Sequence, residues 1–422
     1  MTAAQQSVWI GQQLVPTCPL YNAAEYIQVD GPLDTASFAQ ALRETVAEAD
    51  ALHVRFEVDS GGVTQLLNPP GEWELPILDV SGEPDPDRAA LAWMRTDLQA
   101  VVDLQRGPLF AHALFRLAPD RYQWYHRTHH IALDGYSFSL IANRVAQLYN
   151  AQVTGRPNAA GRLTSLQAAL DDEALYRRSS QYEADQEFWQ ARFANPPQAV
   201  SLSERVSIPC GRLIRRSRQL PAQSMDGWRA LAGQNGATWA EAVLALTALY
   251  VHRHTGADEV VLGLPVMGRL GSATARAPVM LMNTVPLRVP VNLETGPDIV
   301  VRAVVAQMQE IRPHQRYRSE QLRRDLRLVG GSRRLFGPMV NVMPFDYGLH
   351  FAEHPARATN LSAGAAFVED LAIHLHARAD GAPLTLEIDA NPNCYAPAEL
   401  TKHLDQLTDL LTSFTTVRPV SR

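Results

Sequence analysis

The chain has 422 residues, more than one hydrophobic core usually serves, so its length favours two packed lobes of about 150–250 residues each. With 46% hydrophobic and 19% charged residues it has ample apolar material to bury, which excludes disorder as the main state. Lys and Arg total 38 against 44 Asp and Glu, and the resulting net charge of -6 argues against a dedicated nucleic-acid binder.

Three cysteines, Cys18, Cys210 and Cys394, are too few and too scattered for a disulfide framework or a zinc cage. This usage favours a reducing compartment. The N-terminus lacks a basic segment followed by an apolar one, so no secretory signal is predicted. No apolar run approaches the ~20 residues of a membrane helix. We therefore expect a cytoplasmic protein with neither nucleic acid nor membrane as a partner.

The first half of the chain alternates segments of helical and strand periodicity. Two predicted strand pairs are each joined by a short turn, and a loop rich in histidine follows the second pair. The predicted elements are a helix over 36–49, strands over 53–58, 63–67, 109–117 and 122–128, and a helix over 138–150.

From 165 to 193 the sequence is polar and helical, so we place the boundary between the lobes near 170–190. The second half again mixes helices and strands, and Asp380-Gly381 predicts a hairpin turn. Both halves are therefore α/β, or mixed α+β, in character. The predicted elements are helices over 239–252 and 298–310, strands over 259–264, 338–343, 371–376 and 384–388, and a last helix with Leu400, Leu404, Leu407, Leu411 and Phe414 on one face.

The densest group of reactive side chains lies between the strand over 122–128 and the helix that follows. Loops at strand ends let such side chains meet a ligand while the scaffold stays rigid. A glycine there lets the backbone approach a substrate closely or adopt a positive φ. Backbone N–H groups at a helix entrance can face developing negative charge. The group consists of His126, His129, His130, Asp134, Gly135 and Ser137.

Three interpretations of this group stay open on its residues alone. In the first, the histidines are structural and Asp134 or Ser137 caps the helix. In the second, the histidines bind a metal together with Asp134, although an H-E-x-x-H pattern and a nearby Glu base are missing. In the third, one imidazole assists acyl transfer without a covalent intermediate, since neither a G-x-S-x-G elbow nor a catalytic Cys signature accompanies the histidines.

The stretch 129–137, His-His-Ile-Ala-Leu-Asp-Gly-Tyr-Ser, resembles the HHxxxDGxS signature of condensation domains of nonribosomal peptide synthetases. Further segments resemble the family's other motifs in the right order, so the resemblance extends along almost the whole chain. These segments are 2–9, 52–56, 182–189, 266–269 with 282–287, 314–317 and 335–341.

The resemblance implies two chloramphenicol-acetyltransferase-like lobes in a V-shaped pseudo-dimer with a central tunnel. The N-terminal lobe, 1–175, would carry the histidine motif, and the C-terminal lobe, 176–422, would send bridging loops back to it. The implied reaction is attack by the amine of an aminoacyl thioester on a donor acyl thioester, which forms an amide. Each substrate would arrive on the 4'-phosphopantetheine arm of a donor aryl or acyl carrier protein or an acceptor peptidyl carrier protein, with no intrinsic cofactor and no metal.

A narrower resemblance points to the first condensation domain of aryl-capped siderophore synthetases of the enterobactin and bacillibactin type. It implies an aryl donor such as 2,3-dihydroxybenzoyl or salicyl. The stretches that carry it are Trp124-Tyr125, Gln315-Arg316-Tyr317, 335–338, Phe345-Asp346-Tyr347 and 361–364.

The resemblance also implies roles for single residues, each with a structural alternative. His130 takes a proton from the attacking amine or holds the amine by a hydrogen bond, while His129 orients the loop. Asp134 pairs with Arg269, which fixes geometry more than it adds stability. Gly135 places its backbone beside the reacting centre. The supporting residues are Ser137, which otherwise only caps the helix, and Asn341, which lines the tunnel or else ties strand to strand.

The main alternative is a catalytically silent module of the same fold that docks carrier proteins. The intact histidine pair disfavours it, and also a cyclization domain, whose motif is based on aspartate. An epimerization domain usually departs from the fifth and seventh motifs, and a metal-dependent hydrolase is a remote option. Nine arginines between Arg302 and Arg334 either steer an acidic carrier or form a solvated helix surface. We expect a monomer that continues into an adenylation domain.

Overall fold

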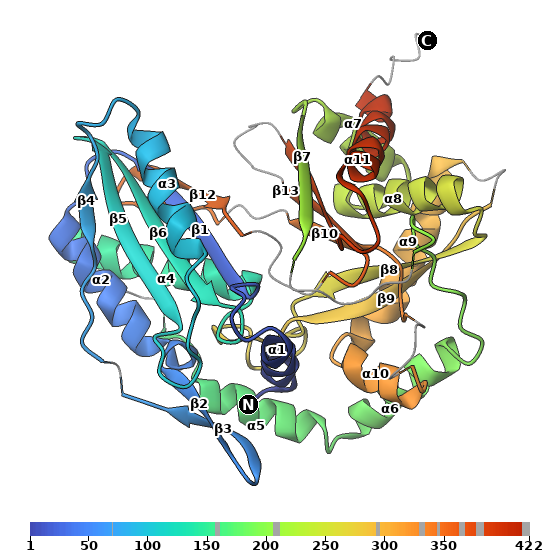
Figure 1. Cartoon of the computed structure of the whole chain (residues 1–422), viewed down its shortest axis with the longest axis horizontal. Helices are drawn as coiled ribbons and strands as arrows, with labels where there is room; N and C mark the ends of the chain where they lie inside the picture. The colour runs from blue at the N-terminus through green and yellow to red at the C-terminus, as the bar shows by residue number, and fades with distance from the viewer. Residues whose placement is uncertain are drawn as a thin grey trace. The chain divides into compact units, whose positions relative to one another are not determined.

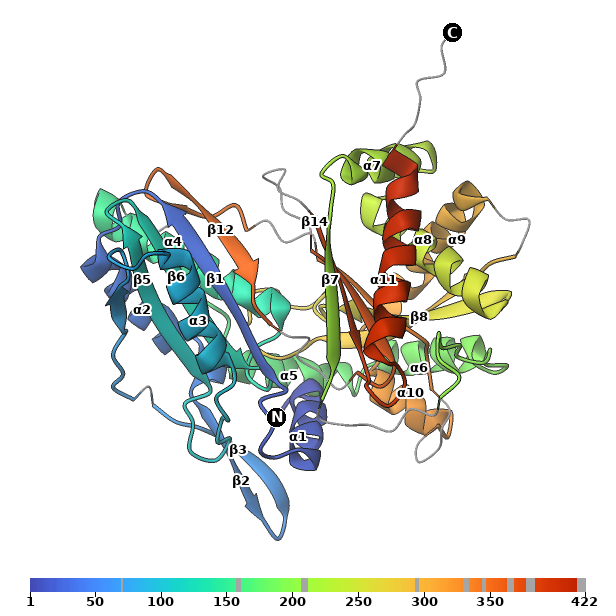
Figure 2. The ribbon, with the colours of Figure 1, turned by 45° about the horizontal axis from the view of Figure 1, so that its top comes forward.

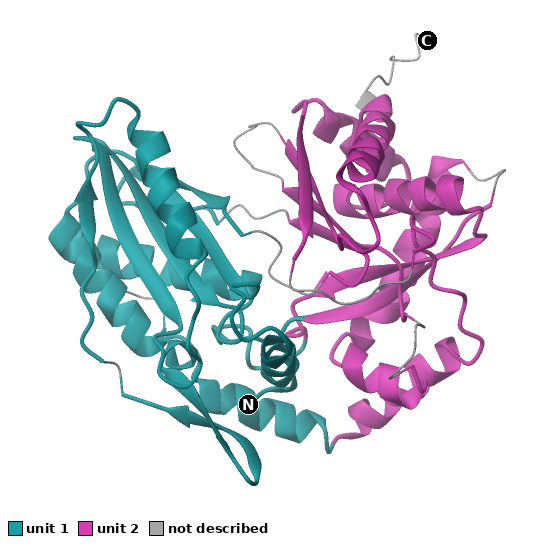
Figure 3. Cartoon of the chain, viewed as in Figure 1, with its two compact units in different colours: residues 1–178, 271–282, 346–366 teal, residues 179–270, 283–345, 367–422 magenta. Residues whose placement is uncertain are grey.

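The computed structural model describes residues 1–69, 71–156, 161–205, 212–292, 296–328, 334–343, 347–362, 368–376 and 384–415. The chain divides into two compact units (Figure 3). Unit 1 comprises Met1–Arg178, Gly271–Met282 and Asp346–Ala366, and unit 2 comprises Ser179–Leu270, Asn283–Phe345 and Phe367–Arg422. Two segments from the second half of the sequence thus belong to unit 1. None of the described helices is long and apolar enough to cross a membrane.

Unit 1 is built on one six-stranded sheet (Figure 1). From edge to edge its strands are β11 (His350–Phe351), β12 (His354–Asn360), β1 (Asn22–Asp30), β6 (Arg121–His129), β5 (Phe110–Ala118) and β4 (Ile77–Asp79). Neighbouring strands are antiparallel except β4 and β5. β2 (Val54–Asp59) and β3 (Gly62–Leu67) form a separate hairpin. The central pair β1 and β6 sets Glu25 opposite His126.

Helices α2 (Thr35–Glu48) and α4 (Gly135–Thr154) cover one face of this sheet, and α3 (Pro86–Leu98) covers the other (Figure 2). Unit 1 also contains α1 (Ala3–Leu14) and α5 (Leu166–Tyr176). On one face, Phe38 of α2 contacts Trp124 edge-on, and on the other face Trp93 of α3 contacts Tyr125. Because adjacent strand residues point to opposite faces, the neighbours Trp124 and Tyr125 mark the two layers.

Unit 2 has its own six-stranded sheet (Figure 1). In order its strands are β7 (Ile214–Leu220), β14 (Leu384–Ala390), β13 (Leu371–His376), β10 (Met339–Met343), β8 (Glu259–Val266) and β9 (Asn283–Pro290). β10 is parallel to β8 and β13, and the other neighbours are antiparallel. The predicted pairing of 371–376 with 384–388 is confirmed, while Asp380-Gly381 lies outside the described residues.

The helices of unit 2 are α6 (Ser180–Arg192), α7 (Ser224–Gln234), α8 (Trp239–Thr255), α9 (Pro297–Ile311), α10 (Ser319–Asp325) and α11 (Pro397–Thr412). α8 begins with a capping box between Thr238 and Glu241 and ends at Gly256 in the left-handed conformation. α11 buries the predicted leucine stripe in the core of this unit. Both units are therefore mixed α/β, as predicted.

A buried ion pair ties α4 to α2. Arg144 Nε and Nη2 donate to the Glu48 carboxylate at 2.9 and 2.6 Å, and both side chains are almost fully buried. Burial by itself raises the pKa of Glu48, but the hydrogen bonds and charge of Arg144 outweigh it and hold the pKa below its ordinary value. We predict that Arg144→Ala lowers the free energy of unfolding at pH 7 by about 3–5 kcal/mol, because a buried carboxylate loses its partner.

Urea denaturation measures this loss, and Arg162→Ala is the matched control. Arg162 reaches the same carboxylate at 3.5 Å from an exposed position, so its removal is expected to cost less than about 1 kcal/mol. Because the pKa of Glu48 is lowered in the folded state, the contribution of the pair is present above the unfolded pKa and lost as the pH falls through the folded pKa. Equal losses in the two variants would contradict the assignment.

Candidate active site

The histidine motif lies in unit 1, in the short link between β6 and α4. β6 ends at His129 and α4 begins at Gly135, so 130–134 form the link. The predicted strand and helix are confirmed, with α4 starting three residues before the predicted 138. His126 lies on β6, and its side chain points to the same face of the sheet as that of Thr128 two residues later.

Asp134 is the N-cap of α4 and is almost completely buried. Its Oδ1 accepts hydrogen bonds from the backbone N–H and the hydroxyl of Ser137, at 3.0 and 2.7 Å. Its Oδ2 accepts the backbone N–H groups of Leu281 and Met282, at 3.0 and 3.1 Å. One carboxylate thus starts the helix and ties the segment 271–282 into unit 1. Ser137 supports this cap from the first turn of the helix and is not itself the cap.

Both ring nitrogens of His129 are bonded within the protein. Nδ1 accepts the backbone N–H of Ile131 at 3.2 Å, and Nε2 lies 3.1 Å from Oε1 of Gln12. An amide oxygen only accepts, so Nε2 carries the proton. Burial, with a contribution from neighbouring His130, lowers the pKa of His129 to about 3. The ring is therefore neutral, and its bonds suit orientation of the loop. Because both ring nitrogens of His129 are already hydrogen-bonded, the metal interpretation of the histidine group loses one of its proposed ligands.

His130 is held in the opposite tautomer. Its Nδ1 lies 2.7 Å from the backbone oxygen of Leu133, which only accepts, so Nδ1 carries the proton and Nε2 keeps its lone pair. Its backbone N–H donates to the carbonyl of Tyr21 at 2.7 Å. Burial lowers the pKa of His130, against the opposing effects of Asp134 and the Leu133 carbonyl. At neutral pH the ring can accept a proton at Nε2.

Gly135 is the first residue of α4 and is exposed. It is not among the glycines with positive φ, so the suggestion of a positive φ is wrong, because the residue already has the helical conformation. A Cβ built on Gly135 would meet no atom within 4 Å. Open space beside this backbone is what close approach by a substrate requires.

The opening segment 2–9 anchors the motif loop. Gln5 Nε2 donates to the carbonyl of Ile131 at 3.0 Å, and the Thr2 hydroxyl donates to the carbonyl of Met280 at 2.8 Å. The sequence singled out this segment but missed Gln12 and Tyr21, which hold the two histidines. No pattern in the sequence marks either residue, because both act through single bonds to a loop more than 100 residues away.

Arg269 and Asn341 belong to unit 2. Arg269 is 3% exposed and donates from Nη1 to the carbonyl of Met267 at 3.0 Å, while its predicted pairing with Asp134 stays a prediction. Asn341 is half-buried on β10, opposite His374 of β13. Its neighbour Val340 packs in the core, so Asn341 points to the other face of the sheet.

The arginines between 302 and 334 lie on and around α9 and α10. Arg318 pairs with Glu320 at 2.8 Å and Arg323 with Glu369 at 2.9 Å, which neutralises part of the predicted basic run. This favours a solvated surface over a steering field, although Arg333 lies outside the described residues.

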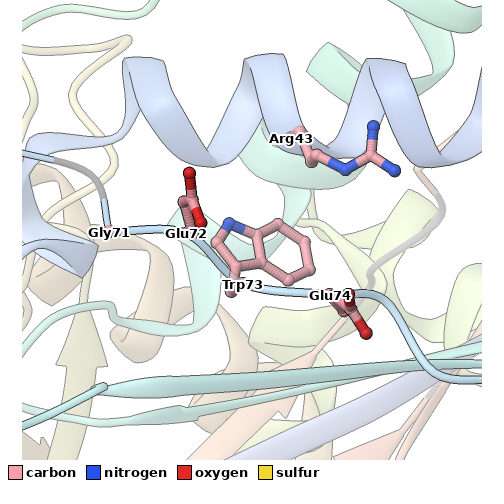
Figure 4. A pocket seen from close by; sticks show the side chains of 5 residues that line it. All are labelled: Arg43, Gly71, Glu72, Trp73 and Glu74. Atoms are coloured by element: carbon pink, nitrogen blue, oxygen red, sulfur yellow. The ribbon is translucent and has the colours of Figure 1, made fainter.

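A surface cavity of about 630 Å³ lies between α2 and the segment 71–74 (Figure 4). Trp73 forms one wall, and Arg43, Glu72 and Glu74 are exposed at its rim. None of the predicted site residues lines this cavity, so it is separate from the motif.

A neutral imidazole that keeps an accepting nitrogen can take up a proton from a group bound beside it. Comparisons with known proteins give the family. The Condensation domain model matches residues 1–417. The chain is 45% identical to the dimodular nonribosomal peptide synthase of Bacillus subtilis (strain 168) and 47% identical to the isonitrile lipopeptide synthase of Streptomyces coeruleorubidus, in each case over 97% of the chain.

Enterobactin synthase component F of Escherichia coli (strain K12) is 33% identical over 98% of the chain. The chain spans 17%, 28% and 32% of the length of these three relatives, respectively. A solved structure of the starter condensation domain of rhizomide synthetase, in complex with C8-CoA and Leu-SNAC, matches with a TM-score of 0.88. It is 36% identical, and the match covers 98% of this chain and 94% of that one. The chain belongs to the condensation domains of nonribosomal peptide synthetases, and it is an amide-forming acyltransferase.

Asp134→Asn tests the cap. The substitution replaces one acceptor oxygen with a donor NH2 group, which then faces N–H donors in either orientation of the amide. We predict that the free energy of unfolding falls by about 1–3 kcal/mol for each donor left unpaired. Guanidinium denaturation measures this change. Asp171→Asn on α5 is the matched control: its exposed carboxylate accepts only from Gln167 among the contacts described, and its change should stay within about 0.5 kcal/mol. A near-neutral Asp134→Asn would show that the carboxylate does not organise the loop.

Proposed function

We propose that this chain joins a carrier-bound aryl donor to the amine of a carrier-bound aminoacyl acceptor, with His130 as the catalytic residue. The observation that carries the proposal is the tautomer of His130. Nδ1 of His130 lies 2.7 Å from the carbonyl oxygen of Leu133 and donates its proton to that oxygen. Nε2 is therefore the nitrogen that accepts a proton. The lowered pKa keeps this nitrogen unprotonated at neutral pH.

Amide formation by direct attack of the amine needs no nucleophile from the protein. The acceptor amine attacks the carbonyl carbon of the donor thioester, the C–N bond forms, and the C–S bond breaks. The proton released by the amine passes to Nε2 of His130 and then to the departing thiolate of the donor phosphopantetheine. The N–H groups at the start of α4 and the open backbone at Gly135 suit the developing negative charge on the carbonyl oxygen.

The aryl donor is supported by the narrower resemblance of short stretches and by the 33% identity to enterobactin synthase component F. Phe345-Asp346 and residues 363–364, which carry part of that resemblance, lie outside the described residues. A second candidate donor is an alkyl chain. It is favoured by the 47% identity to a lipopeptide synthase and by the complex of a related starter domain with C8-CoA.

The acceptor and donor carriers are proposed from the family, in which substrates are presented on phosphopantetheine arms. A silent docking module is the remaining alternative. It would need no particular tautomer at His130, whereas here the carbonyl of Leu133 and the backbone of Tyr21 fix both the ring and the main chain of this residue.

His130→Ala is predicted to slow amide formation by about 10²–10⁴-fold, because positioned proton transfer is lost. Intact-mass detection of product on the acceptor carrier measures it, with hydroxybenzoyl- or octanoyl-loaded donor carriers and a panel of aminoacyl-loaded acceptors. His254→Ala removes an exposed histidine of unit 2 and is expected to leave the rate unchanged.

Product formed equally fast by His130→Ala would demote His130 to a structural role. Absence of product from wild type with every pairing, although both carriers bind, would favour the docking module. Product from octanoyl but from no aryl donor would replace the aryl assignment with the alkyl one.

A further inference from the structure

The last turn of α1 contains a buried glycine, Gly11, directly against the ring of Tyr21. A glycine inside a helix destabilises the helix relative to alanine, because glycine loses more backbone freedom on folding. Here the missing side chain makes room for a neighbour. A Cβ built on Gly11 would lie 2.0 Å from the hydroxyl oxygen of Tyr21 and 2.9 Å from Cζ of its ring. Any larger residue at this position therefore has to displace Tyr21.

Tyr21 connects Gly11 to the histidine motif. Its backbone carbonyl accepts the N–H of His130 at 2.7 Å, and its ring centroid lies 5.9 Å from that of His129. Tyr21 is 7% exposed, and a close-packed interior leaves its ring little space into which to retreat. A Cβ on Gly11 would require the hydroxyl to move by more than an ångström. Such a movement would reach both histidines.

Gln12, the next residue of α1, holds the neighbouring histidine. Its Oε1 lies 3.1 Å from Nε2 of His129, the nitrogen that carries the ring proton. Its Nε2 donates to the carbonyls of Val15 and Cys18, at 2.9 and 3.2 Å. The side chain is 5% exposed. One buried amide thus joins the end of α1, the turn that follows it and the ring of His129.

We propose that Gly11 and Gln12 are positioning residues for amide formation. Gly11 acts through Tyr21 on the backbone of His130, and Gln12 acts on the ring of His129. Together they set where Nε2 of His130 lies, and a misplacement of about 1 Å can cost about 100-fold in rate. The inference rests on the proposed function, because it takes His130 as the residue that accepts the proton of the amine.

Gly11→Ala is the first test, since alanine is the better helix former and a loss points to the contact with Tyr21. We expect kcat for amide formation, measured by intact mass with loaded carriers, to fall by about 10–100-fold. KM for the loaded carriers should stay within about threefold, because the added methyl group is buried. Gly233→Ala on α7 is the matched control: a Cβ there meets no atom within 4 Å, and kcat should not change.

Amide hydrogen exchange supplies a readout besides activity. The N–H of His130 is protected by its bond to the carbonyl of Tyr21, so Gly11→Ala is expected to raise its exchange rate by about tenfold or more. The backbone amides of β8 in unit 2 should keep their wild-type rates. Thermal melts of all variants check the fold.

Tyr21→Phe tests the route through the tyrosine. It removes the hydroxyl oxygen that lies nearest to the built Cβ and keeps the backbone carbonyl. In the Tyr21→Phe background, Gly11→Ala should lower kcat by no more than about threefold, because two residues in contact are coupled.

Gln12→Met tests the second residue. It keeps a side chain of similar length without the amide, and we expect kcat to fall by about 5–10-fold, the factor that one hydrogen bond supplies. Gln13→Met, at the adjacent exposed residue of α1, is the matched control and should leave kcat unchanged. This comparison decides if Gly11→Ala alone does not fold.

The proposal is overturned if Gly11→Ala keeps the wild-type kcat or the wild-type exchange at His130, or if its loss persists in the Tyr21→Phe background. Equal kcat values for Gln12→Met and Gln13→Met would also overturn it. Failure of the proposed function looks different: His130→Ala then forms product as fast as wild type, while Gly11→Ala still accelerates exchange at His130.

Discussion

The buried carboxylate of Asp134 is the constraint on which the rest of the site depends. Among the contacts described, it accepts hydrogen bonds from the backbone and hydroxyl of Ser137 and from the backbone of Leu281 and Met282. Hydrogen bonds to an ionised acceptor are shorter and stronger than neutral ones, so the set fixes the start of α4 firmly. Only the link 130–134 joins that helix to β6. A displacement of Asp134 would therefore move the carbonyl of Leu133 and the ring of His130 with it.

The two adjacent histidines differ through the atoms that face them. His129 is bonded on both nitrogens, to Gln12 and to Ile131, and burial lowers its pKa to about 3. His130 is bonded on Nδ1 to a carbonyl, and the proton that this bond requires leaves the lone pair on Nε2. Identical side chains thus serve different ends, one as part of the loop's scaffold and the other as the proposed proton acceptor.

Periodicity in the sequence was enough to predict the elements that carry the motif. The strand over 122–128 and the leucine stripe of the last helix are both present, because alternation and helical spacing reflect which face is buried. The start of α4 was predicted three residues late, because the apolar pattern begins at Phe138 and the cap lies before it. The helix Pro86–Leu98 was missed, although Asp85 as N-cap followed by a proline is a recognised start signal.

The tautomers of His129 and His130, and the long-range hydrogen bonds that hold the motif, could not be predicted from the sequence. The bond that orients His129 comes from Gln12, 117 positions away, and two of the donors to Asp134 come from 147 and 148 positions away. Neither separation leaves a local pattern. That Gly271–Met282 belongs to unit 1 could not be predicted from the sequence either. The segment is held by backbone hydrogen bonds to a carboxylate, and such bonds do not require particular side chains in the segment.

The proposed reaction requires that His130 is neutral and carries its proton on Nδ1, so that Nε2 accepts the proton of the amine. Long-range ¹H–¹⁵N NMR on protein labelled at the histidine ring nitrogens measures the tautomer directly, and the signals that vanish in His130→Ala assign the ring. At pH 7 we expect a protonated Nδ1 and an unprotonated Nε2 for His130, with the reverse pattern for His129. A protonated Nε2 on His130 at that pH, in either a neutral or a charged ring, would contradict it.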